Sequence, residues 1–314
     1  MSEEKIKEHG LKLFSPVFVI IAASLWAVDG IVLRPSLYSL PVTLVVFVES
    51  SIVALILTPF FRKYFSVIRS LTPKDWLAFI GVALFGGAIG TMAITKALFY
   101  VDYVNLSIVV FIQKMQPIFA IALAGIILKE KLKKEFFLWA SIATFSAYLM
   151  TFGLHLPNLD TGDKTTLAAL FALLAAASFG SSTVLSKRAL RNVSYELGTY
   201  LRFSITSLIM LIIVLSSGTI ASISQITNNQ LWIFLLIAFT TGGPAIFLYY
   251  YGLKNISASV ATICELAFPL VAVALEYFVH DNILSPIRWV GAILLIISIL
   301  KVSGIKTFAL QKAS

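Results

Sequence analysis

The stretch SIVVFIQKMQPIFAIALAGIILKEKLKK, residues 107–134, decides the fold class of this chain. Its apolar part is about 20 residues long, the length that an α-helix needs to cross the hydrocarbon core of a bilayer. Lys114 lies inside the apolar part, and a cluster that begins at Lys129 and ends at Lys134 follows it. The stretch therefore predicts a membrane-spanning helix with a basic end and a charge near its middle.

The composition of the whole chain indicates the same class. The 314 residues are 59% hydrophobic and 12% charged, with a mean hydropathy of +0.94. A soluble domain is usually about 45–50% apolar and about 25% charged, so we expect an integral membrane protein with the lipid bilayer as its surroundings. The net charge of +9 reflects the Lys and Arg that membrane proteins carry in cytoplasmic loops. Nucleic acid is therefore not expected as a partner.

Cysteine and histidine are scarce. Cys264 is the single cysteine, which rules out an internal disulfide and any metal site built from several cysteines. The three histidines, His9, His155 and His280, lie in the N-terminal tail and at expected helix ends. We therefore expect neither a metal site nor a cofactor.

Ten apolar blocks separated by charged, Pro- or Asn-containing joints are expected to cross the bilayer. They cover residues 16–34, 41–61, 75–100, 104–128, 135–154, 165–186, 196–216, 230–252, 257–279 and 286–304. Alternate connections hold 18 of the 24 Lys and Arg residues, whereas those on the other side hold only Arg34, Lys164 and Arg288. Because positive residues stay in the cytoplasm, this asymmetry predicts an all-α protein with ten transmembrane helices and both termini cytoplasmic.

The two halves of the chain resemble each other. A shift of 152 residues lays the segment from Gly90 over the segment from Gly242, and a shift of 153 aligns the surroundings of Glu49 and Arg202. The pairs matched in this way are Gly90 with Gly242, Ser107 with Ser259, Pro117 with Pro269, Arg34 with Lys187, and Glu49 with Arg202. Each half holds five spans, and an odd number means that the second copy is inverted in the membrane, an arrangement typical of secondary transporters.

These observations give the expected organisation of the chain. It comprises a cytoplasmic tail over residues 1–15, a first five-helix repeat over 16–155, a second five-helix repeat over 165–304, and a cytoplasmic tail over 305–314. In this arrangement a substrate site would lie near the midplane, between the two repeats.

Four segments carry a resemblance to a known family. They are ASLWAVDG (23–30), IQKMQPIFAIALAGIILKEKL (112–132, which contains Glu130), AAASFGSSTVLSKRAL (175–190) and CELAFPLVAVALEYFVHDNIL (264–284). With these segments the chain resembles the drug/metabolite transporter superfamily, in its EamA-type branch of paired five-helix repeats. The resemblance implies a ten-helix permease with a central cavity lined mainly by spans 1, 3, 4, 6, 8 and 9.

Several ionisable residues lie within the expected spans. They are Asp29, Glu49, Lys96, Lys114, Arg202, Glu265 and Glu276. A charge at the centre of a span costs about 2.5–3.5 kcal/mol, so these side chains must pair, face water or lie near a surface. Counting along the helices puts Lys114 and Glu265 near the midplane, and Glu265 matches Gln113 in the alignment of the halves. One interpretation is a substrate site in which Lys114 meets a carboxylate and Glu265 an amine; the other is a structural salt bridge between spans 4 and 9.

For the other candidate site residues, a structural role is at least as well supported as a role in substrate binding. Asp29 and Trp26 share one face of span 1, and with Glu49 they would balance Lys96 in the outer half. Glu49 and Arg202 are expected to be structural, on peripheral spans. Besides Lys114 and Glu265, the candidates for substrate contact are Trp26, Asp29, Lys96, Gln113, Ser178 and Tyr250. Helix packing is the alternative for Ser178, and an interfacial belt is the alternative for Tyr250. Kinks or hinges are expected at Pro117, Pro269, Gly242, Gly243 and Pro244.

The function expected from the sequence is secondary transport. The chain would move a small polar or amphipathic metabolite, such as an amino acid or an amine, across the cytoplasmic membrane as a permease or exporter working by alternating access. No phosphate-binding loop is present, so energy would come from a gradient, with Glu265 or Glu49 as the proton carrier. The alternatives are a flippase for a lipid or lipid-linked head group and, with no nucleophile or metal motif in its favour, an intramembrane enzyme. Monomer and dimer both remain open.

Overall fold

The computed structural model describes residues 14–100, 106–156, 163–280 and 285–304. Every regular element in this part of the chain is helical, and ten segments of it are long and apolar enough to cross a membrane. These spans are Ser15–Leu37, Val42–Arg69, Pro73–Leu98, Ile108–Leu128, Lys134–Phe152, Lys164–Ala189, Tyr195–Ser216, Asn228–Asn255, Ala258–Leu275 and Pro286–Ser303. The expected class, an all-α membrane protein with ten spans, is confirmed. Most of the two expected tails, residues 1–13 and 305–314, lies outside the described residues.

The α-helices within and between these spans are α2 (Ser15–Val28), α3 (Val42–Phe61), α4 (Phe65–Arg69), α5 (Pro73–Val82), α6 (Gly90–Leu98), α7 (Leu106–Gln113), α8 (Gln116–Leu123), α9 (Lys134–Phe152), α10 (Asp163–Ala189), α11 (Tyr195–Ser216), α12 (Asn228–Ile237), α13 (Gly243–Asn255), α14 (Ala258–Cys264), α15 (Ala267–His280) and α16 (Pro286–Ser303). Short π-helical segments are η1 (Asp29–Leu33), η4 (Ala83–Ile89), η6 (Ala124–Leu128) and η8 (Ala238–Gly242), and 3₁₀ turns are η2 (Arg34–Leu37), η3 (Arg62–Tyr64) and η7 (Thr219–Gln225).

Capping residues fix the starts of spans 3 and 8. The Thr72 hydroxyl accepts a hydrogen bond from the Asp75 backbone N–H, and the Asp75 carboxylate accepts one from the Thr72 N–H. Thr227 and Gln230 make the same reciprocal pair before α12. A capping box satisfies amide groups that the first turn of a helix leaves without partners, so both spans begin where the sequence places Thr.

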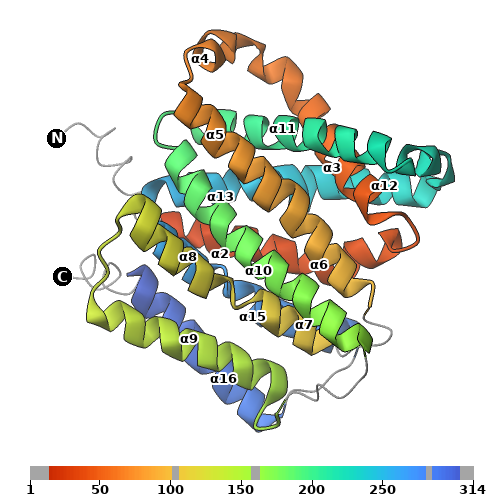
Figure 1. Cartoon of the computed structure of the whole chain (residues 1–314). Helices are drawn as coiled ribbons and strands as arrows, with labels where there is room; N and C mark the ends of the chain where they lie inside the picture. The colour runs from red at the N-terminus through yellow and green to blue at the C-terminus, as the bar shows by residue number, and fades with distance from the viewer. Residues whose placement is uncertain (1–13, 101–105, 157–162, 281–284, 305–314) are drawn as a thin grey trace.

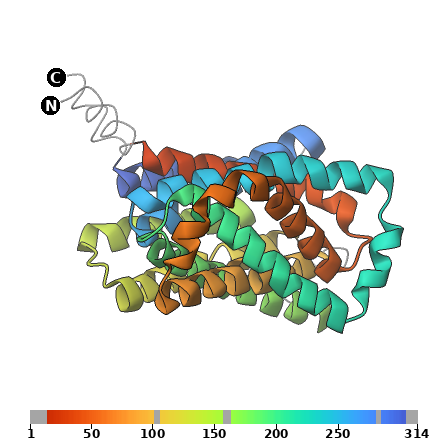
Figure 2. The same cartoon turned by 90° about the horizontal axis from the view of Figure 1, so that it is seen from above.

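The axes of the spans are roughly aligned, and the spans pack in layers (Figure 1, Figure 2). In Figure 1, α9 and α16 pack on each other at the bottom of the molecule, and α3 and α11 pack on each other at the top. Between these pairs, α2 packs on α13, and the long α10 packs on α6 and α8. Helices of the N-terminal half of the chain thus pack directly on helices of the C-terminal half.

Spans 4 and 9 are broken near their middles. Helix α7 ends at Gln113 and α8 begins at Gln116, and likewise α14 ends at Cys264 and α15 begins at Ala267. Pro117 and Pro269 lie just beyond these two breaks. Proline removes a backbone hydrogen bond from a helix, and such an interruption is tolerated in a membrane where the helix lines a cavity.

A glycine brings span 6 close to span 4. A Cβ atom added at Gly180 would lie 3.0 Å from both the Ala120 nitrogen and the Gln116 oxygen, which are backbone atoms of α8. Only glycine permits this approach. It holds α10 against α8, the part of span 4 that follows the break.

Candidate functional site

A cavity of about 230 Å³ lies inside the helix assembly. Eight of the ten described spans contribute to its wall, and spans 5 and 10 do not. The family resemblance implied a lining from six spans, and the structure adds spans 2 and 7, which contribute Glu49 and Arg202. The charged groups of the wall are Asp29, Arg34, Glu49, Lys114, Arg202 and Glu265, and its aromatic rings are Trp26, Phe179, Phe203, Tyr249 and Phe268.

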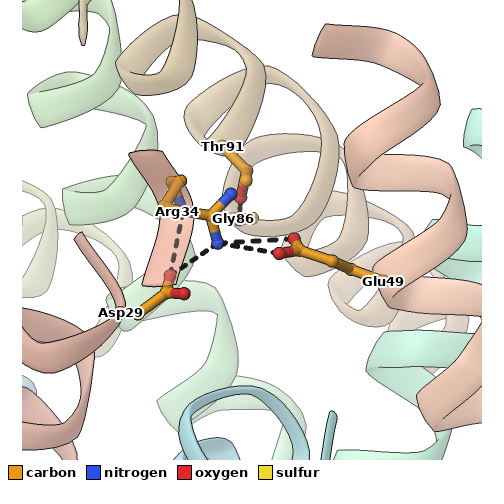
Figure 3. A network of polar contacts seen from close by, with 5 residues as sticks. All are labelled: Asp29, Arg34, Glu49, Gly86 and Thr91. Carbon is orange, nitrogen blue, oxygen red and sulfur yellow. Dashed lines mark hydrogen bonds and ion pairs between the residues drawn. The ribbon is translucent and has the colours of Figure 1, made fainter. Parts of the chain in front are cut away.

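One part of the wall is an ion-pair cluster around Arg34, which we call the Arg34 cluster (Figure 3). Arg34 Nη2 lies 2.6 Å from Asp29 Oδ2 and 3.0 Å from Glu49 Oε1, and Arg34 Nε donates a further hydrogen bond of 2.9 Å to Asp29 Oδ2. All three side chains are about nine-tenths buried. One guanidinium thus joins two carboxylates from spans 1 and 2.

The Arg34 cluster corrects two expectations. Arg34 was expected in an outer connection, but η1 and η2 continue span 1 as far as Leu37 and carry the arginine into the protein. Asp29 and Glu49 were expected to balance Lys96, whereas their partner is Arg34. Lys96 itself is exposed, lies outside the cavity wall, and places its Nζ 5.6 Å from the ring centroid of Tyr100.

A half-buried tyrosine, Tyr38, lies just beyond the Arg34 cluster, in the connection between spans 1 and 2. Burial raises the pKa of Tyr38 to about 12. The charge of Arg34 opposes this shift and that of Asp29 adds to it. Tyr38 is therefore neutral throughout the physiological pH range and contributes a ring, which packs on Phe99 with centroids 5.1 Å apart.

A second polar group of the wall surrounds Glu265 at the break in span 9. Glu265 Oε2 accepts a hydrogen bond of 2.6 Å from Gln116 Nε2, and Oε1 accepts bonds of 2.8 Å from the Tyr249 hydroxyl and 3.4 Å from Thr183 Oγ1. These three donors come from spans 4, 8 and 6. The Tyr249 ring lies 5.2 Å from the ring of Trp26, between centroids. We call Glu265, Gln116, Tyr249 and Thr183 the Glu265 cluster.

Lys114 and Glu265 both line the cavity, but they form no ion pair with each other. Lys114 is nine-tenths buried, and its Nζ lies 3.5 Å from the ring centroid of Phe268, a cation–π contact. The salt bridge between spans 4 and 9, which was one interpretation of the sequence, is therefore absent between these two side chains.

The other expected substrate residues divide between the wall and the packing behind it. Trp26 and Gln113 line the cavity, whereas Ser178 and Tyr250 are buried outside its wall. The Tyr250 hydroxyl bonds to Ser186 at 3.0 Å. Neighbours on the same helices take the places in the wall, namely Ser182 and Thr183 on α10 and Tyr249 on α13.

Arg202 lines the cavity from span 7. Its Nη1 lies 3.4 Å from the Tyr250 hydroxyl and its Nη2 lies 3.3 Å from the backbone oxygen of Gly86. Gly86 belongs to the π-helical segment η4, and the Thr91 hydroxyl donates to the same oxygen at 3.1 Å. Among the residues that the structure describes, Arg202 pairs with no carboxylate.

Glu130 links spans 4 and 9 at one end of the cavity-lining helices. Its Oε1 accepts a bond of 2.8 Å from the Ala258 N–H, and its Oε2 accepts bonds from the N–H of Ser259 at 3.2 Å and from its hydroxyl at 2.6 Å. The preceding Lys129 has a positive φ of 55°, which turns the chain at the end of span 4. The carboxylate thus caps α14, whose other end leads to Glu265.

No group of three or more His, Cys, Asp or Glu side chains that could hold a metal ion occurs within the described ranges.

Comparison with known proteins gives consistent matches. The model of the EamA-like transporter family matches residues 13–152 and again residues 166–304. The chain is 45% identical to the riboflavin transporter ImpX of Fusobacterium nucleatum over 288 residues, and the aligned region covers 91% of this chain and 96% of that protein. It is 28% identical over 188 residues to the uncharacterized transporter YwfM of Bacillus subtilis, covering 60% of this chain and 61% of that protein. A solved crystal structure with 13% sequence identity covers 96% of this chain and 98% of its own with a TM-score of 0.70, which shows a shared fold.

Proposed function

The chain belongs to the EamA-like transporter family, and on that premise we propose that it is a permease for riboflavin or a close chemical relative of it. The family is one of transporters, so the chain is a multi-pass membrane permease rather than an enzyme. The observation that carries the choice of substrate is the 45% identity, over 91% of the chain, to a protein named as a riboflavin transporter.

The chemistry of the cavity supports a flavin. Riboflavin combines a flat aromatic ring system with a hydroxyl-bearing chain and has no net charge at neutral pH. Five aromatic side chains line the cavity and offer ring faces and edges on which a flat solute can stack. Three carboxylates and three cationic groups face the same space, so their formal charges cancel and a neutral solute enters without leaving an excess charge.

We further propose that the two halves form an inverted pair around this site. Residues that match at a shift of 153 both line the cavity, as Trp26 does with Phe179 and Glu49 with Arg202, and Gln113 and Glu265 match at a shift of 152. A binding site between repeats is what inverted repeats produce. Transport would then proceed by alternating access, with both termini in the cytoplasm of a cell whose plasma or inner membrane holds the protein.

The test is transport by the purified full-length chain in liposomes. We expect riboflavin, followed by its fluorescence, to enter vesicles that contain the protein faster than protein-free vesicles, with saturable kinetics. Repeating the measurement with an imposed proton gradient tests Glu265 as a proton carrier, because a gradient that leaves the rate unchanged removes that role.

The same vesicles separate the permease from the flippase alternative. A fluorescent lipid analogue in the inner leaflet is accessible to a reductant added outside only after it has been flipped. Lipid movement without riboflavin entry would favour a flippase and contradict the proposal.

A further inference from the structure

The carboxylates of the cavity wall are already bound by protein donors. Asp29 and Glu49 share Arg34 at 2.6 and 3.0 Å. Glu265 receives short hydrogen bonds from Gln116 at 2.6 Å and Tyr249 at 2.8 Å, one on each oxygen, while Thr183 lies farther away at 3.4 Å. Asp29 Oδ1 has no donor among the described residues, but it is buried out of reach of a solute. A hydrogen bond to a charged group contributes about 1.5–3 kcal/mol, so a solute that approached the other oxygens as a donor would compete with existing bonds.

Two of the three cationic groups in the wall, Lys114 and Arg202, lack a carboxylate partner within the described part of the chain. Lys114 rests on the face of Phe268 and forms no ion pair within the described part of the chain. Glu265 attracts it electrostatically without direct contact. The hydrogen bonds of Arg202, to a backbone oxygen and a tyrosine hydroxyl, are 3.3 and 3.4 Å long, beyond the usual range of about 2.7–3.2 Å. Its guanidinium carbon lies 6.0 Å from the ring centroid of Tyr250. Both side chains line the cavity.

We propose that Lys114 and Arg202 determine specificity by donating hydrogen bonds to acceptor atoms of the substrate, so that the site takes flat solutes with a carbonyl edge and rejects amines. This inference rests on the proposed function and narrows it. Lysine and arginine side chains are donors only, and the flavin ring system carries carbonyl oxygens and ring nitrogens along one edge that can accept from them.

The same arrangement disfavours the amino acid or amine that the sequence suggested as cargo. An ammonium group would enter a space where two cations are unpaired and where every carboxylate already has donors. Specificity of this kind comes from a repulsive element as much as from an attractive one. Glu265, which the sequence presented as the partner of an amine, instead holds three neutral donors of the protein in place.

The experiment compares two tricyclic probes of similar size and shape. Lumiflavin keeps the carbonyl edge of the flavin and is neutral, whereas proflavine is a flat tricyclic amine that carries a positive charge. Each is added to the purified full-length chain with bound radiolabelled riboflavin, and displacement is followed through the radioactivity that the protein retains. We expect lumiflavin to displace riboflavin and proflavine to fail at a concentration about a hundredfold higher. Equal displacement by the two probes would overturn the inference without any variant.

The variant Lys114→Met removes the ammonium and keeps an unbranched apolar side chain of similar length. We expect it to raise the Kd of riboflavin and of lumiflavin by the same factor, about tenfold, as the loss of a charge-assisted hydrogen bond requires. The matched control is Lys96→Met, because Lys96 is exposed on a neighbouring span outside the wall. Unchanged Kd values in Lys114→Met would contradict the inference.

The experiments distinguish failure of the proposed function from failure of the specificity inferred here. If the wild-type chain neither binds nor transports riboflavin, the flavin permease is wrong, and thermal stabilisation by lumiflavin but not by proflavine would still support the preference for acceptors. If riboflavin is transported but proflavine competes with it as well as lumiflavin does, the permease stands and the inference fails.

Discussion

At the scale of single residues, Arg34 forms ion pairs with two buried carboxylates, Asp29 and Glu49. Replacing it with methionine leaves Asp29 and Glu49 buried without a cation. Removing one partner of a buried ion pair costs about 3–5 kcal/mol. We therefore expect Arg34→Met to lower the thermal unfolding temperature in detergent strongly.

Two comparisons make this prediction specific. The control Lys96→Met removes an exposed cation and should leave the unfolding temperature unchanged. Adding Asp29→Asn and Glu49→Gln to Arg34→Met neutralises both acids and should recover part of the loss. An Arg34→Met protein as stable as the wild type would show that the Arg34 cluster does not hold spans 1 and 2 together.

Residue positions along a span were predictable, whereas partners across spans were not. Counting residues from the helix starts placed Lys114 and Glu265 at a common depth, and both line the cavity. The same counting could not show that Glu265 bonds to Gln116 and Tyr249, because these contacts depend on how spans 4, 8 and 9 are rotated about their axes. Successive residues of a helix point about 100° apart. The prediction of Tyr250 instead of Tyr249 on α13 therefore selected the packing side of the helix, whereas the neighbouring residue faces the cavity.

At the scale of elements, the Glu130 carboxylate fixes the start of a short helix. It accepts three hydrogen bonds from the first residues of α14. Loss of a capping side chain costs about 0.5–2 kcal/mol. Since α14 ends next to Glu265, we expect Glu130→Ala to lower stability modestly and to reduce the transport rate more than the affinity for substrate.

The control for Glu130 is on the next helix. Glu135 is an exposed acid in the first turn of α9, so Glu135→Ala removes the same charge without touching α14. Initial rates of uptake at several riboflavin concentrations separate the maximal rate from the half-saturating concentration. Equal transport by the two variants would contradict a role of Glu130 in positioning span 9.

The existence and limits of the spans could be predicted because hydropathy and length determine which segments can cross a bilayer. Their irregularities were only partly visible. The breaks in spans 4 and 9 lie beside Pro117 and Pro269, which the sequence marks clearly. The π-helical segment η1, in contrast, contains no proline. Together with η2, which begins at Arg34, it extends span 1 to Leu37, and for that reason the location of Arg34 could not be foreseen.

At the scale of the whole molecule, the cavity needs residues from both halves of the chain. The family resemblance implied a lining without spans 2 and 7, which were therefore expected at the periphery. The structure brings Glu49 and Arg202 from these spans to the wall. Their participation depends on the packing of α3 on α11, a contact between halves that hydropathy does not encode.

The orientation of the two halves leads to a labelling prediction. Ser70 and Ser217 follow the second span of the first and second half, and both are exposed. If the halves are inverted, these equivalent connections lie on opposite sides of the membrane, and the distribution of Lys and Arg puts Ser70 in the cytoplasm. Cys264 is the single cysteine, so Cys264→Ser gives a background free of thiols.

In that background, a maleimide that cannot cross membranes should label Ser217→Cys in intact cells. It should label Ser70→Cys only after the cells are permeabilised. Ser36, exposed in the last turn of span 1, provides a further point, because Ser36→Cys should behave like Ser217→Cys. Labelling of Ser70→Cys and Ser217→Cys from the same side would mean that the halves are parallel. A site between inverted repeats, and the alternating access derived from it, would then have to be abandoned.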